Sequence, residues 1–111
     1  MVRTMNEVAT AAGFSAVDTG VYLQPIVQGS NFQCEFNLFY NPGDPGEVKR
    51  VREASIAAVK KLLGKGAFFS RPHGETARLV MNRDAATVQT LKRVKSIVDP
   101  DNIMNPGKLC F

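Results

Sequence analysis

The stretch that decides the fold is residues 32–48, with the sequence FQCEFNLFYNPGDPGEV. Its first half alternates apolar and polar residues, which predicts a β-strand with one apolar face. Its second half places Asp44 as the N-cap of a helix, with a proline directly after it and Glu47 three positions later. This is the spacing of a capping box, so a helix is expected to begin here. A strand that leads directly into a capped helix favours an α+β domain.

Upstream of this stretch, the residues at 21–28 predict a first strand, and Gly29-Ser30-Asn31 supplies a tight turn between the two. Pro25 lies inside this first strand and cannot donate a ladder hydrogen bond, which indicates an edge strand or a bulge. Residues 4–12 predict a short helix that stops at Gly13, although its apolar pattern is weak.

Downstream, the capped helix is expected to end at Gly64. Its apolar positions recur every three or four residues and predict one buried stripe, made of Val48, Val51, Ser55, Ala58, Val59 and Leu62. A short third strand is expected over Ala67–Phe69. A further helix begins at Asp84 and ends before Pro100, with a stripe made of Val88, Leu91, Val94 and Val98. The sequence therefore predicts an α+β fold, a small antiparallel sheet with helices packed on one face. Such a small sheet leaves an edge or apolar face open, so burial against another subunit is expected.

Length and composition narrow the classes of function. The chain has 111 residues, 44% of them hydrophobic and 22% charged, which suits one domain over residues 1–111. The net charge of +4 is spread over helical stretches, which favours solvated helix faces over a nucleic-acid surface. No apolar run is long enough to span a membrane. Residues 1–10, MVRTMNEVAT, lack the long apolar stretch of a signal peptide, so export is not expected. The two cysteines form no CxxC motif and the chain has a single histidine, which argues against a metal site. Two lone cysteines also suit a reducing compartment, so we expect the protein in the cytoplasm.

Polar residues that could carry chemistry gather in one place, residues 70–75, with the sequence SRPHGE. Arg71 offers a planar fork of donors to an anion, and His73 can exchange a proton near neutral pH. The chain has no Ser-His-Asp combination, since His73 is its only histidine, and no glycine-rich loop that could hold a phosphate. On its own, such a loop is more often plain surface than a site.

The end of the chain, LKRVKSIVDPDNIMNPGK at residues 91–108, resembles the C-terminal signature of FAD-linked oxidases of the vanillyl-alcohol oxidase and p-cresol methylhydroxylase superfamily. Those enzymes close with a helix and then Lys-x3-Asp-Pro-x2-Ile-x-Asn/Ala-Pro-Gly-Lys. The order of elements upstream also matches their cap domains, including a ferredoxin-like sheet. The resemblance implies a substrate-side cap domain of an enzyme that oxidises a small alcohol, phenol or hydroxyacid.

The resemblance also implies roles for single residues. Arg71 matches an arginine that holds a phenolate oxygen, with Ser70 at the neighbouring position that usually holds tyrosine. His73 matches the histidine of a Glu-His-Gly stretch that acts near the flavin, and Pro72 replaces its metal-binding glutamate. Asn105 and Lys108 lie in the tail that returns to the flavin domain. The family's glycine-rich domain for FAD is missing, so FAD must be held by another domain or subunit and the chain alone should be inactive.

A second interpretation stays open, because the residues alone also suit a small α+β interaction module that dimerises, binds a ligand or contacts RNA. Tight binding of FAD by the isolated chain would contradict the first interpretation. Salt-dependent affinity for RNA would favour the second.

Overall fold

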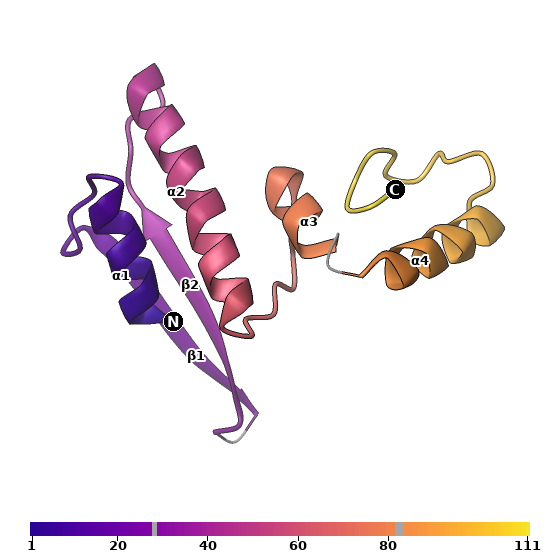
Figure 1. The fold of residues 1–111 in the computed structure, drawn as a ribbon, viewed down its shortest axis with the longest axis horizontal. Coiled ribbons are helices and arrows are strands. Elements are labelled where there is room, and N and C mark those ends of the chain that lie inside the picture. The colour runs from indigo at the N-terminus through magenta and orange to yellow at the C-terminus, as the bar shows by residue number, and fades with distance from the viewer. Residues whose placement is uncertain (28, 82–83) are drawn as a thin grey trace. The chain divides into compact units, whose positions relative to one another are not determined.

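The computed structural model describes residues 1–27, 29–81 and 84–111. The described chain divides into two compact units, Met1–Lys65 and Gly66–Phe111 (Figure 1). Each is described by itself below. Together they contain four helices and a two-stranded antiparallel sheet within the described residues, which confirms the α+β class.

The first unit runs in the order α1 (Val2–Ala11), β1 (Thr19–Val27), β2 (Asn31–Leu38) and α2 (Pro45–Gly64). The two strands form the predicted hairpin, and each begins and ends within a few residues of the expected bounds. Their register pairs Val21 with Phe36 and Leu23 with Cys34. It shifts between Pro25 and Val27, so the proline coincides with the irregularity that the sequence predicted.

Helix α2 begins as its sequence dictates. Asp44 accepts hydrogen bonds from the backbone N–H groups of Gly46 (2.8 Å) and Glu47 (3.4 Å), which satisfies donors that the first helical turn leaves free. The Glu47 carboxylate reaches back further than a capping box requires and accepts from the backbone N–H of Asn41 at 2.7 Å. The loop before the helix is therefore fixed from both ends.

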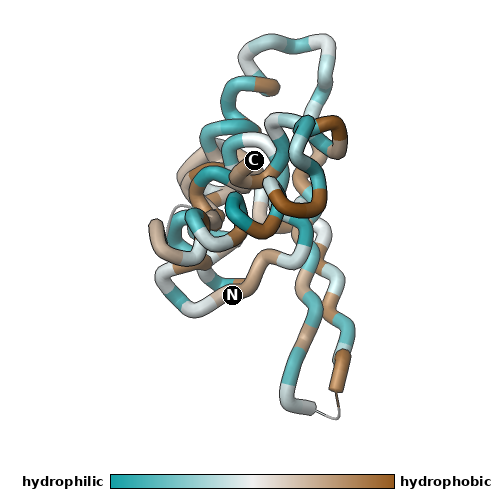
Figure 2. The backbone as a smooth tube through the Cα atoms, turned by 90° about the vertical axis from the view of Figure 1, so that its right-hand side faces the viewer, coloured by the Kyte–Doolittle hydropathy of each residue, from teal (hydrophilic) through white to brown (hydrophobic). Residues whose placement is uncertain are grey.

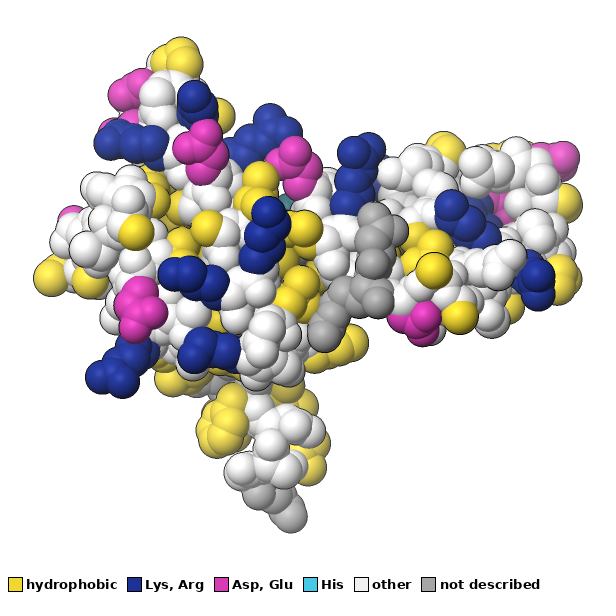
Figure 3. Space-filling view, viewed as in Figure 1, with side chains coloured by type: hydrophobic (Ala, Val, Ile, Leu, Met, Phe, Trp, Pro, Cys, Tyr) yellow, Lys and Arg dark blue, Asp and Glu magenta, His cyan; other side chains and the backbone are white. Residues whose placement is uncertain are grey.

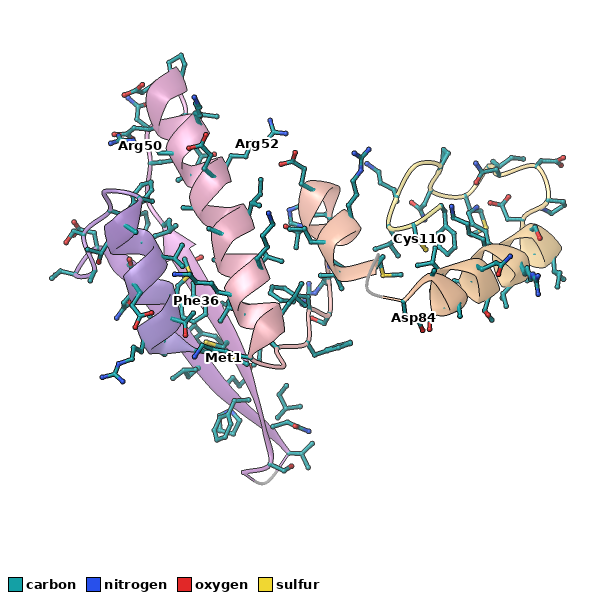
Figure 4. All side chains as sticks on the ribbon, in the orientation of Figure 1. Met1, Phe36, Arg50, Arg52, Asp84 and Cys110 are labelled. Atoms are coloured by element: carbon teal, nitrogen blue, oxygen red, sulfur yellow. The ribbon has the colours of Figure 1, made fainter. Side chains whose placement is uncertain are left out.

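Helix α1 forms the centre of the core despite its weak apolar pattern. Met5 and Val8 pack against Ala54 and Ala58 of α2, and partly buried side chains complete the cluster: Ala12, Phe14, Phe36 and Leu38. The last two come from β2, so α1 and α2 lie on one face of the hairpin, as predicted (Figure 4 labels Phe36). Of the stripe expected on α2, Ala58, Val59 and Leu62 are buried, while Val48 and Ser55 are exposed.

The glycines that end helices are Gly13 and Gly66. Gly13 (φ +81°) follows α1, and the next residue donates to the carbonyl of Ala9 in the pattern of a Schellman motif. The prediction that Gly64 would play this part after α2 is wrong, because Gly64 is the last helical residue and the left-handed conformation lies at Gly66 (φ +80°).

The second unit differs most from the prediction. The expected strand at Ala67–Phe69 is wrong, since these residues pair with neither β1 nor β2 and lead into a helix that the sequence did not reveal, α3 (Gly74–Met81). Helix α4 (Ala85–Val98) begins at Asp84 as expected, but none of its residues is buried. Val98, for example, is 72% exposed. An amphipathic stripe is buried only where a second layer meets it, and the described residues of this unit supply none.

Candidate functional site

The loop of residues 70–73 carries three of the predicted site residues and leads directly into α3. Ser70, Arg71 and His73 are all exposed. The carbonyl of His73 accepts from the backbone N–H of Ala77 at 3.2 Å, so this residue directly precedes α3 and accepts its first hydrogen bond, as an N-cap residue does. Its position is therefore fixed by the helix, while its ring stays accessible to solvent.

The His73 ring contacts the backbone of Arg71 within this loop. Nδ1 of the His73 ring lies 3.4 Å from the backbone carbonyl oxygen of Arg71. When Nδ1 carries the proton it donates to this oxygen, which leaves Nε2 as the nitrogen that can accept a proton. The loop thus places a guanidinium, a proton acceptor and the Ser70 hydroxyl within four consecutive residues. This set can hold an anionic group and move a proton beside it.

The tail after α4 is held by a buried carboxylate. Asp99 forms an ion pair with Lys95 one helical turn earlier, and it accepts from the backbone N–H groups of Ile103 (2.9 Å) and Met104 (3.0 Å). The Lys95 ammonium also donates to the carbonyl of Met104 at 3.0 Å and lies 5.6 Å from the centre of the Phe111 ring. We call this group the tail clasp: Lys95, Asp99, Met104 and Phe111.

The tail clasp gives the Lys-x3-Asp spacing a physical reason. Lys-x3-Asp puts the ammonium and the carboxylate on the same helix face, where they can pair. The hydrogen bond from Lys95, and then those from the two backbone N–H groups, lower the pKa of Asp99, against the opposing effect of its burial. The Ile103 side chain is 76% exposed, so polar contacts of Asp99, and not burial of this residue, hold the tail. Sequence reasoning missed the roles of Lys95 and Asp99, although their spacing of four was visible.

Asn105 and Lys108 share a turn after the tail clasp. Asn105 adopts a φ of +49°, a left-handed conformation that asparagine tolerates better than most residues, and its carbonyl accepts from the backbone N–H of Lys108 at 3.2 Å. Both side chains are exposed. Among the described residues, no hydrogen bond or ion pair is found between this turn and the loop of Arg71 and His73.

The first unit contains a hollow of about 290 Å³ that the sequence did not suggest. Arg50 lies over the Phe14 ring at 5.9 Å and pairs with Glu47 at 3.4 Å, and Asp18 completes the charged lining (Figure 4 labels Arg50). The network closes the start of α2 against the loop that follows α1. Its two carboxylates outnumber its one guanidinium, so the hollow disfavours anions.

Elsewhere in the described residues, charged and metal-binding side chains are dispersed. Figure 3 shows Lys and Arg side chains scattered among acidic and apolar ones on the visible face. No group of three or more His, Cys, Asp or Glu side chains could hold a metal ion in the part of the chain that the structure describes. Within that same part, no helix combines the length and the apolar character that crossing a membrane requires.

Comparison with known proteins decides the family. A family model described as FAD linked oxidases, C-terminal domain, matches residues 1–109. The chain belongs to this family. It is similar to a probable mitochondrial D-lactate dehydrogenase from Danio rerio, with 30% identity over 87 residues that cover 75% of this chain and 17% of the relative. The chain thus spans less than a fifth of that relative's length. No solved structure matches it.

FAD is the cofactor of the family, but the described residues do not fit it. A site for so large a ligand is a deep pocket, usually with convergent backbone N–H groups for the phosphates. The hollow beside Arg50 is lined by two carboxylates. A second hollow is an open groove along the surface of α1. The glycines with positive φ lie apart in separate turns, so the described backbone forms no phosphate cradle from them.

Proposed function

We propose that this chain is the substrate-side cap domain of an FAD-dependent oxidoreductase of the vanillyl-alcohol oxidase and p-cresol methylhydroxylase superfamily. Its substrate is a small alcohol, phenol or hydroxyacid. The family match supports the flavin chemistry, and the name of the Danio rerio relative favours the hydroxyacid among these classes. A separate domain or subunit holds FAD, which supplies the redox chemistry once bound.

One observation carries this proposal. In the exposed loop that leads into α3, the His73 ring contacts the backbone carbonyl of Arg71. In the proposed role, the Arg71 guanidinium binds the carboxylate or phenolate of the substrate, and the Ser70 hydroxyl adds a donor or acceptor beside it. Nε2 of His73 takes the proton from the substrate hydroxyl as it is oxidised. Docking of the cap over the cofactor excludes water from this loop, which strengthens both interactions.

In the same proposal, the turn with Asn105 and Lys108 faces the flavin domain, and the tail clasp fixes the backbone that leads to it. The enzyme acts in the cytoplasm, which suits two unpaired thiols, Cys34 and Cys110.

The division of labour is tested by titrating FAD into the purified chain and following flavin fluorescence. We expect no saturable binding by the chain alone, and binding only when the flavin domain is added. Tight binding by the isolated chain would overturn the proposal.

The site is tested in the holoenzyme assembled from this chain, the flavin domain and FAD. Arg71→Lys keeps the charge but loses the planar fork, so KM should rise about tenfold or more. Arg78→Lys makes the same exchange at an exposed position of α3 and should leave KM unchanged. His73→Gln should lower kcat by roughly 10² to 10⁴. Equal effects of the two arginine variants would contradict the assignment of Arg71.

A further inference from the structure

The helix that follows the loop of Arg71 and His73 begins in an unusual way. Helix α3 starts at Gly74, and the carbonyl of His73 accepts its first backbone hydrogen bond, so Gly74 is the first helical residue. This position ordinarily has a φ of about −65°, which is why it favours proline, and Pro45 fills it in α2. Gly74 instead has a φ of +53°, in the left-handed region.

The backbone angle, and not a lack of space, explains the glycine at position 74. A Cβ atom placed on Gly74 would meet no described atom within 4 Å beyond its chain neighbours and its own helix backbone. Its φ is one that most residues with a side chain avoid, because their Cβ would crowd the following carbonyl oxygen. The position therefore has room for a side chain but selects a left-handed backbone.

This angle sets the direction of the loop. The φ of residue 74 is the rotation about its N–Cα bond, which joins the loop to α3. A change from +53° to an ordinary helical value turns the loop by roughly 115° relative to the helix. The contact between Nδ1 of His73 and the carbonyl oxygen of Arg71 lies on one side of this bond, and Pro72 restricts the backbone between the two residues. Arg71 and His73 therefore turn together.

We propose that Gly74 is a positioning residue, whose left-handed conformation directs Arg71 and His73 toward the substrate. This inference rests on the proposed function, because Gly74 acts only through those two side chains. The His73 ring depends on it most, since the short side chain cannot compensate for a turned backbone and a proton is transferred only across hydrogen-bond distance. The guanidinium of Arg71 has a longer, flexible side chain, so it can follow a displaced carboxylate or phenolate.

The first test uses the isolated chain and needs neither FAD nor substrate. Residual dipolar couplings of the Cα–H bonds of Arg71 and His73, compared with those of the α3 amides, report the direction of the loop. Gly74→Ala favours a negative φ and should change the couplings of both residues. Gly74→Asn should keep them, because asparagine tolerates the left-handed region. Unchanged couplings in Gly74→Ala would overturn the proposal.

The second test measures kcat and KM of the holoenzyme assembled from this chain, the flavin domain and FAD. Gly74→Ala should lower kcat by about tenfold or more, because a small misplacement of a reacting group is costly, and should change KM less. Gly74→Asn should retain most of kcat although its side chain is larger. The reverse order, with Asn worse than Ala, would indicate crowding at this position and would refute the role of the backbone angle.

Two glycines provide matched controls. Gly29 also has a left-handed φ, +79°, and lies at the tip of the hairpin, which extends past the ends of α1 and α2 in Figures 1 and 2. Gly29→Ala should lower stability and leave kcat unchanged, so equal losses of kcat in Gly29→Ala and Gly74→Ala would contradict positioning. Gly64→Ala makes the same change at the end of α2, outside the left-handed region, and should leave both unchanged.

The two tests separate this inference from the proposed function. If His73→Gln leaves kcat unchanged, the proposed function fails, and the couplings of the isolated chain still decide whether Gly74 directs the loop. If His73→Gln lowers kcat and Gly74→Ala does not, the proposed function stands and the positioning role of Gly74 is wrong.

Discussion

Removal of two methyl groups from α1 tests whether this helix holds the first unit together. Val8 is 3% exposed and lies in the cluster formed with Met5, Ala54 and Ala58. The change Val8→Ala removes about two carbon groups from the core, each worth about 0.8 kcal/mol by transfer, and leaves a small cavity. We expect the free energy of unfolding to fall by about 2 kcal/mol. A core of this size has little stability to lose, so the change is a large fraction of the total.

The assay is urea denaturation followed by circular dichroism in the helical region. Val17→Ala is the matched control, because it makes the same change at a side chain that is 92% exposed. It should shift stability by less than about 0.5 kcal/mol. Equal midpoints for the two variants would refute the packing of α1 against α2. Loss of helical signal in Val8→Ala without denaturant would support the packing of α1 against α2 more strongly than a shifted midpoint.

Four further predictions concern a helix cap, the tail clasp and a thiol. Asp44→Ala removes the acceptor for two backbone N–H groups and should cost about 1 kcal/mol in urea denaturation, whereas Asp101→Ala, at an exposed tail position, should cost little. Asp99→Asn removes the ion pair of the tail clasp and should speed hydrogen exchange at the Ile103 amide; unchanged exchange would contradict the role of the carboxylate. Since folding lowers the pKa of Asp99, its stabilising effect is present above the ordinary aspartate value of about 3.9 and should be lost as pH falls through the lower folded value. Burial raises the pKa of Cys34, so its alkylation should accelerate only at higher pH than the alkylation of a free thiol. A rate equal to that of a free thiol at every pH would exclude this.

The sequence predicted the first unit well because its signals are local. The hairpin follows from period-two alternation around a turn, and the start of α2 follows from Asp44, whose side chain satisfies donors a few residues away. For the first unit, the weakest sequence-based prediction was helix α1. Met5 and Val8 show little pattern by themselves, and their importance comes from the small residues on α2 that let the two helices approach.

The second unit was predicted poorly because its signals need partners. The residues at Ala67–Phe69 have a strand-like composition, but a strand exists only where another strand can pair with it. The stripe on α4 was predicted to be buried, and this was wrong, because nothing in the described unit covers it. In the candidate site, the loop of Arg71 and His73 was visible as a polar cluster, while α3, which fixes it, was hidden by a short and partly polar sequence.

The tail clasp orders a stretch of coil without burying a single large apolar side chain. Polar bonds around Asp99 fix the backbone, while Ile97, Val98 and Ile103 stay in contact with water. Such a tail has already lost most of its chain entropy before it meets any other surface. Whatever receives those aliphatic groups therefore gains their full desolvation energy with little loss from immobilising the loop, and a modest footprint can hold this end of the protein firmly.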